Sequence, residues 1–114
     1  MPRLLGMDLR GHLDLLLLAC LHDTGPVHGY GLIAALRDSS AGTFNLPEGT
    51  VYPALHRLER DGLVASEWDT TAPRRRRVYA LTPAGRAAMA DRGQQWREFA
   101  TAMQLVLGKI QFAP

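Results

Sequence analysis

Four consecutive arginines, Arg74, Arg75, Arg76 and Arg77, form the densest charge cluster of the sequence. Like charges repel, so a fold gains nothing from such a run by itself. A guanidinium group can bind phosphate oxygens or a guanine edge with two parallel N–H groups. Alternate residues of a strand face opposite sides, so at least two of these arginines point outward together. The cluster therefore indicates contact with a phosphate backbone or a minor groove, with a solvated loop as the alternative.

A second candidate surface lies in the segment that ends at Gly62. When Val51 is placed at the centre of a buried helical face, Leu55 and Leu58 fall beside it. The opposite side has few acids and carries small residues near its start. DNA-reading helices have such a face, although an ordinary solvated amphipathic helix shares the pattern. The DNA-contacting candidates here are Thr50, Tyr52, Pro53, His56, Arg57 and Arg60, and Tyr30 of the preceding segment is added to them.

Residues with catalytic or metal-binding chemistry are scattered along the chain. No pair of its histidines has the spacing of a metal site, and its serines lie in no nucleophile elbow. Cys20 is the one cysteine, lies in an apolar run and can form no disulfide within the chain. We therefore expect no enzymatic activity, no catalytic residue, no cofactor and no metal.

Hydrophobic periodicity and turn signals predict the elements that position these side chains. Three helices are expected before the arginine run, over residues 9–22, 28–37 and 50–61. Pro47 opens the third helix at a tolerated first-turn position, with Asn45 as the capping candidate. Pro53 removes a backbone donor, so the regular part of this helix is expected only from residue 50. Gly62 ends it as a left-handed cap.

The arginine run lies at the return of a predicted hairpin. Residues 63–68 and 76–81 alternate apolar and polar side chains, as half-buried strands do. A last helix begins with Thr82 as N-cap and Pro83 at its first position, and continues to residue 107. The order predicts a mainly α fold with a small β-hairpin: a winged helix-turn-helix domain over residues 1–82 and a C-terminal dimerisation helix with tail over residues 83–114. Some protein-interaction modules use the same topology.

The last predicted helix carries two apolar rows that repeat every seven residues, which is typical of a coiled-coil seam. The first predicted helix is apolar on more than one face and so needs a second partner surface. We expect a homodimer, with packing inside one subunit as the alternative. The predicted interface comprises Leu16, Cys20, Met89, Trp96, Phe99, Met103, Val106 and Ile110.

Large aromatic side chains at such a seam can also line a pocket for a flat apolar ligand. Simple interface packing is the alternative. The residues predicted to line this pocket are Trp96, Phe99, Met103, Leu13 and Leu17.

The composition fits one globular domain. The chain has 114 residues, 46% hydrophobic and 21% charged, and a net charge of only +2. It is therefore not a polycation, although 12 of its 13 basic residues are arginine. We find no secretory signal and no apolar run near the roughly 20 residues of a membrane span, and expect a cytoplasmic protein without membrane contact.

Three sequence blocks resemble the PadR family of bacterial transcriptional regulators: HGYGL at 28–32, EGTVYPALHRLERDGL at 48–63 and RRRVYALTPAG at 75–85. The resemblance implies a winged-helix homodimer that usually represses nearby genes. It implies DNA contacts by Thr50, Tyr52 and Arg57. Some relatives bind aromatic drugs between paired tryptophans of the last helix, and Trp96 stands at that position. A lysine is common in the family where His56 stands, and a glycine where Ala72-Pro73 precedes the arginines.

These observations together favour a ligand-responsive repressor that binds a palindromic operator in double-stranded DNA as a homodimer, with a small aromatic effector. Two alternatives stay open: a winged-helix protein-interaction module without DNA binding, and a ligand-binding dimer whose DNA role is secondary.

Overall fold

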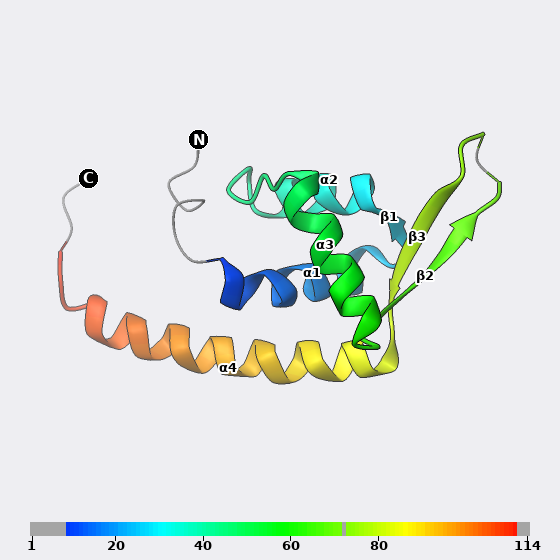
Figure 1. Cartoon of the computed structure of the whole chain (residues 1–114). Coiled ribbons are helices and arrows are strands. Elements are labelled where there is room, and N and C mark those ends of the chain that lie inside the picture. The colour runs from blue at the N-terminus through cyan, green and yellow to red at the C-terminus, as the bar shows by residue number, and fades with distance from the viewer. Residues whose placement is uncertain (1–8, 72, 112–114) are drawn as a thin grey trace.

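The computed structural model describes residues 9–71 and 73–111 and has the winged-helix architecture that the sequence predicts. In Figure 1, α1, α2 and α3 form a compact cluster, the hairpin of β2 and β3 projects from one end of it, and α4 runs along its base. The elements are α1 (Arg10–Thr24), β1 (Val27–His28), α2 (Gly29–Ser39), α3 (Glu48–Arg60), β2 (Val64–Asp69), β3 (Arg76–Leu81) and α4 (Pro83–Leu107).

Pro47 precedes helix α3, which is regular from Glu48, two residues before the predicted start of its regular part. Pro47 is itself the N-cap in an extended conformation, and its carbonyl oxygen accepts hydrogen bonds from the amides of Thr50 (3.0 Å) and Val51 (3.1 Å). No side chain caps this helix, so the assignment of Asn45 as its cap is wrong. The helix also continues through Pro53, whose exposed ring does not delay its regular part. The segment that carries the predicted DNA contacts of α3 is therefore helical from Glu48 onward.

The sheet has a third strand that the sequence analysis missed. The strand order is β1-β3-β2, with all pairs antiparallel. Strand β1 has two residues, too few to show an alternating pattern, and pairs Val27 with Tyr79 of β3. This pairing attaches the hairpin of β2 and β3, which we call the wing, to the start of α2. Strand β3 is therefore hydrogen-bonded on both of its edges.

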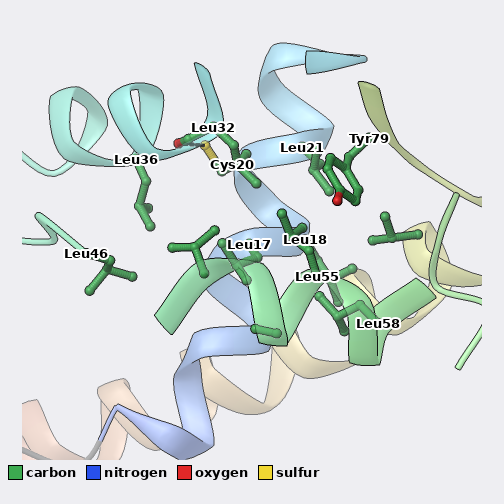
Figure 2. Packing of buried hydrophobic residues seen from close by; sticks show 13 residues of the cluster. Leu17, Leu18, Cys20, Leu21, Leu32, Leu36, Leu46, Leu55, Leu58 and Tyr79 are labelled. Carbon is green, nitrogen blue, oxygen red and sulfur yellow. Dashed lines mark hydrogen bonds between the residues drawn. The ribbon is translucent and has the colours of Figure 1, made fainter. Parts of the chain in front are cut away.

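The hydrophobic core lies between α1, α2, α3 and the sheet (Figure 2). Burying this apolar surface is the main force that holds α3 in place. Cys20 belongs to the core: its Sγ atom donates to the Leu32 carbonyl oxygen at 3.9 Å, and burial raises the pKa of the thiol. The buried residues are Leu17, Leu18, Cys20, Leu21, Leu32, Leu36, Leu46, Val51, Ala54, Leu55, Leu58, Val64 and Tyr79.

A compact joint connects the end of α3, the end of β3 and the start of α4. Thr82 caps α4 as predicted, because its Oγ1 atom accepts a hydrogen bond from the Gly85 amide at 3.0 Å. The same hydroxyl donates to the Gly62 carbonyl oxygen at 2.7 Å. Gly62 has a φ of 78°, the left-handed conformation expected of it. The Thr82 side chain thus links the end of α3 to the start of α4.

Helix α4 spans the predicted residues, from Pro83 to Leu107. None of the helices in the described part of the chain is both long and apolar enough to cross a membrane.

Candidate nucleic-acid interface

The outward face of α3 is open to solvent. Val51, Leu55 and Leu58 are buried beneath it, as the helical phase predicts. Gly49, Pro53, His56 and Arg60 are exposed on the opposite side.

Tyr52 stands on the flank of α3 that faces the wing and is half-buried. Its ring packs against Gly29, where a Cβ would overlap the Tyr52 hydroxyl and ring edge. Tyr30 meets the same ring edge-on, with 6.3 Å between centroids. Burial and the Glu48 carboxylate raise the pKa of Tyr52, and Glu48, acting first through a hydrogen bond, raises that of Tyr30. Both phenols therefore stay protonated at neutral pH; the Tyr30 hydroxyl is shared with Glu48, and the Tyr52 hydroxyl can donate to an anion.

An open cup of about 330 Å³ brings the flank of α3 and the wing onto one side of the subunit. Three tyrosines, a tryptophan, two histidines and three arginines contribute to its wall, so it is both aromatic and basic. Its lining residues are His28, Gly29, Tyr30, Tyr52, His56, Trp68, Arg75, Arg76, Arg77 and Tyr79. The structure thus unites six of the predicted contact residues, Tyr30, Tyr52, His56, Arg75, Arg76 and Arg77, in one surface.

Arg77 is held by the protein itself. Its Nε and Nη2 atoms donate to the Ser66 hydroxyl at 2.9 and 2.7 Å, and Nη2 lies 3.7 Å from a Glu59 carboxylate oxygen. The Ser66 hydroxyl in turn donates to Glu59, with O···O distances of 2.7 and 2.9 Å. Because Glu59 is on α3, Ser66 on β2 and Arg77 on β3, this cluster connects the wing to α3 and restrains the angle between them. Arg77 is therefore a positioning residue as well as part of the cup.

Arg57 does not face outward with His56 and Arg60. It lies on the other flank of α3, where it forms an ion pair with Asp14 of α1. Arg92 of α4 approaches the same carboxylate, at 3.8 Å from its second oxygen. The guanidinium of Arg57 is still 41% exposed, but its charge already has a partner. The outward placement expected for Arg57 is therefore wrong.

The remaining contact candidates do not line the cup. Pro53 and Arg74 are exposed, and Arg60 is exposed with its Nε atom 3.8 Å from Asp61. Thr50 is half-buried about two helical turns before Arg57 and shares its flank.

Helix α4 leaves an apolar surface uncovered along its second half. Among the predicted interface residues, Trp96, Phe99, Met103, Val106 and Ile110 are exposed. Met89 and Leu16 are instead partly buried against the core, and Cys20 lies within it. These three residues serve the subunit's own packing, because the first turns of α4 already lie on α1.

Two grooves flank Trp96, where α4 runs beside α1. One, of about 620 Å³, is lined by His12, Asp14, Leu15, Arg92, Gln95, Trp96 and Phe99. The other, of about 750 Å³, also has Trp96 in its wall, together with Leu9, Leu15 and Leu16. Leu17 is fully buried and Leu13 packs against the core, so the expectation that they line a ligand pocket is wrong. Met103 lines neither groove, and His12 contacts Trp96 edge-on, with 5.2 Å between centroids.

Several residues of this surface were missed from the sequence. Trp68 is the last residue but one of β2 and is exposed beside the arginines. The available signal was an aromatic residue in the strand that pairs with the basic run. Ser66 and Asp14 carried no signal, because their partners are distant in the sequence. Among residues 9–71 and 73–111, no three His, Cys, Asp or Glu side chains are grouped closely enough to hold a metal ion.

Comparison with known proteins gives consistent matches. The model of the Transcriptional regulator PadR-like family matches residues 17–91. The transcriptional regulator Rv3488 of Mycobacterium tuberculosis is 46% identical over 74 residues, which are 65% of this chain and 66% of that protein, just under two thirds of its length.

Solved structures agree with these sequence matches. A PadR family transcriptional regulator from Eggerthella lenta has a TM-score of 0.75 and 33% identity, covering 86% of this chain and 83% of that one. A transcriptional regulator from Clostridium thermocellum has a TM-score of 0.76 and 26% identity, covering 84% and 90%.

Proposed function

Because the chain belongs to the PadR-like family of transcriptional regulators, which are not enzymes, we propose that it binds double-stranded DNA as a homodimer and represses transcription. In each subunit α3 enters the major groove of one operator half-site and the wing contacts the adjacent backbone. The observation that carries this proposal is the cup, where hydroxyls and a histidine of α2 and α3 share one open side with the wing arginines.

The chemistry of this surface fits a duplex better than a protein partner. Tyr52 supplies a neutral donor for a phosphate oxygen, and Arg75 and Arg76 supply charge. The exposed face of α3 has its small residue, Gly49, in the first turn, which allows close approach to base edges. A winged-helix protein-interaction module has no need of this concentration of arginine.

Selection of bound duplexes from a random pool tests the proposal directly. We expect a dyad-symmetric site, with binding that weakens steeply as salt rises. Arg75→Ala and Arg76→Ala are each expected to make the salt dependence shallower. Arg37→Ala is the matched control, because it removes the same charge from the far end of α2, where Arg37 pairs with Asp38 at 3.3 Å. Absence of binding even at low salt would support the protein-interaction module instead.

The homodimer rests on the exposed seam of α4. Phe99 and Val106 repeat at seven residues, as do Trp96, Met103 and Ile110, and each of these residues is at least 43% exposed. Two copies of this helix can cover each other along the seam.

Neighbouring residues provide the test for dimerisation. Val106 (64% exposed) lies on the seam, whereas Leu105 (68% exposed) lies one position off it. We expect Val106→Glu to shift the sedimentation mass toward one subunit and Leu105→Glu to leave it unchanged. Equal behaviour of both variants would refute this seam.

Ligand response is a second candidate function, supported by the grooves on both sides of Trp96. A flat aromatic effector that fits them better in one dimer geometry than in another would change the spacing of the two reading helices. Titration of a Trp68→Phe variant, in which Trp96 alone fluoresces, with flat aromatic compounds tests this. We expect the fluorescence of Trp96 to be quenched over the same range of ligand concentration in which operator binding is lost. If the quenching saturates while operator binding is unchanged, the protein binds the ligand without any effect on DNA binding.

A further inference from the structure

Trp68 is an unusual residue for the end of a short strand. The same strand begins with Val64, which is 2% exposed, yet the Trp68 ring is 48% exposed. About half of Trp68 therefore lies outside the core, where the ring is open to its charged neighbours.

Two wing arginines lie over this ring. The guanidinium carbon of Arg75 is 4.5 Å from the ring centroid and that of Arg77 is 5.0 Å away. Arg77 is also fixed by Ser66 and lies directly across the sheet from Trp68. Within the described part of the chain Arg75 forms no ion pair, so the tryptophan ring is its main support.

This arrangement solves a problem that the arginine run creates. Adjacent guanidinium groups repel one another and would spread into solvent, and ordering such long side chains on DNA would then cost conformational entropy. A tryptophan ring attracts a guanidinium through its face. The N–H groups at the edge of the guanidinium stay available, and those are the groups that bind phosphate in pairs.

We propose that Trp68 is a positioning residue that holds Arg75, beside the anchored Arg77, as a preformed clamp for one backbone phosphate of DNA. The proposal rests on the DNA-binding function above and assigns a role to a residue that carries no charge. The open side of the cup, next to Tyr52 and His56, is where that phosphate would lie.

Comparing variants that remove a charge with variants that do not distinguishes the positioning role of Trp68 from direct electrostatic attraction between the wing and DNA. Arg75→Ala should weaken duplex binding and lower the slope of log K against log salt by about 0.9, the value for one phosphate contact. Trp68→Ala should weaken binding about two- to five-fold, the range for an exposed cation–π pair, and leave the slope unchanged because no charge is lost. Trp68→Phe, which keeps an aromatic face, should recover most of the affinity.

The duplex for these measurements is the one selected from the random pool, and binding is followed by fluorescence anisotropy of the labelled DNA. Thermal unfolding of each variant checks that the subunit is folded. If Trp68 acts through Arg75, Trp68→Ala should have almost no further effect in an Arg75→Ala background. An undiminished effect there, or a Trp68→Phe variant as weak as Trp68→Ala, would overturn the proposal.

A measurement without DNA tests the stack itself. The Nε–H resonance of Arg75 should carry a ring-current shift that disappears in Trp68→Ala, and a resonance that does not move would refute the stack. Failure of the proposed function would look different, because the unchanged protein would then show no salt-dependent binding to any duplex.

Discussion

Asp14 should restrain DNA binding while it stabilises the fold, so Asp14→Asn should change the two properties in opposite directions. The carboxylate of Asp14 accepts from Arg57 of the reading helix and lies 3.8 Å from Arg92 of α4. Both arginines are about two fifths exposed, with side-chain exposures of 41% and 43%. Each such pair contributes about 0.2–1 kcal/mol, so losing both should lower the free energy of unfolding by about 1 kcal/mol. The melting temperature should fall by about 4 °C.

The effect on DNA follows from the release of Arg57. With its partner neutral, this guanidinium is free to reach a backbone phosphate at the flank of α3. The slope of log K against log salt should then steepen by about 0.9. Asp38→Asn is the matched control: it makes the same change in net charge, but Asp38 is 73% exposed and pairs with Arg37 at the end of α2. It should leave both the slope and the melting temperature nearly unchanged.

Thermal denaturation and salt-dependent binding to the selected duplex measure the two effects on the same samples. If Asp14→Asn and Asp38→Asn bind with the same slope, Arg57 does not reach DNA when released. If Asp14→Asn binds more weakly than the unchanged protein, Asp14 presents Arg57 to DNA rather than withholding it, and the reasoning fails.

Three further outcomes are expected. Gly85→Ala should destabilise the fold by about 3 kcal/mol in denaturant titrations, because its Cβ would overlap the Leu63 carbonyl oxygen, a backbone atom that cannot move alone; a loss below about 1 kcal/mol would contradict this. Gly29→Ala should instead leave the melting temperature within a few degrees and weaken DNA binding, because the added methyl displaces the tyrosine ring of α3. Hydrogen bonds from Thr71 hold the pKa of Asp69 below its ordinary value. The ionised carboxylate therefore stabilises the fold at pH values above its ordinary pKa. This stabilisation is lost as the pH falls through the lower pKa of the folded state. Thr71→Ala should raise the pKa of Asp69 in an NMR titration, and an unchanged value would contradict the assigned cause.

Local signals were sufficient for most of the fold. The start of α4 follows from Thr82 and Pro83, whose capping and N-terminal preferences act within one turn. The buried side of α3 follows from the spacing of Val51, Leu55 and Leu58. The start of the regular part of α3 was misplaced because the penalty assigned to Pro53 is local, whereas packing of the buried face holds the helix regular across it.

The site was harder to predict, because it depends on contacts between distant segments. Helical phase placed Arg57 near the outer face, but Asp14, 43 residues away in the sequence, draws it to the inner flank. The wing arginines were identified as a group, yet nothing local distinguishes Arg77, which Ser66 anchors, from Arg76, which is exposed. The role of Trp68 emerges only when the hairpin register places it opposite Arg77.

The joint at Thr82 makes α4 a lever. Its 25 residues extend about 37 Å at the usual rise per residue, which is comparable to the roughly 34 Å between half-sites one DNA turn apart. The start of α4 is fixed by the hydrogen bond from Thr82 to Gly62, just after the end of α3. If α4 tilts by about 5° about this joint, its far end moves by about 3 Å relative to α3. If the chain binds DNA as proposed, a substitution near the far end of α4 is expected to change the spacing of the two α3 helices without touching any residue of the cup.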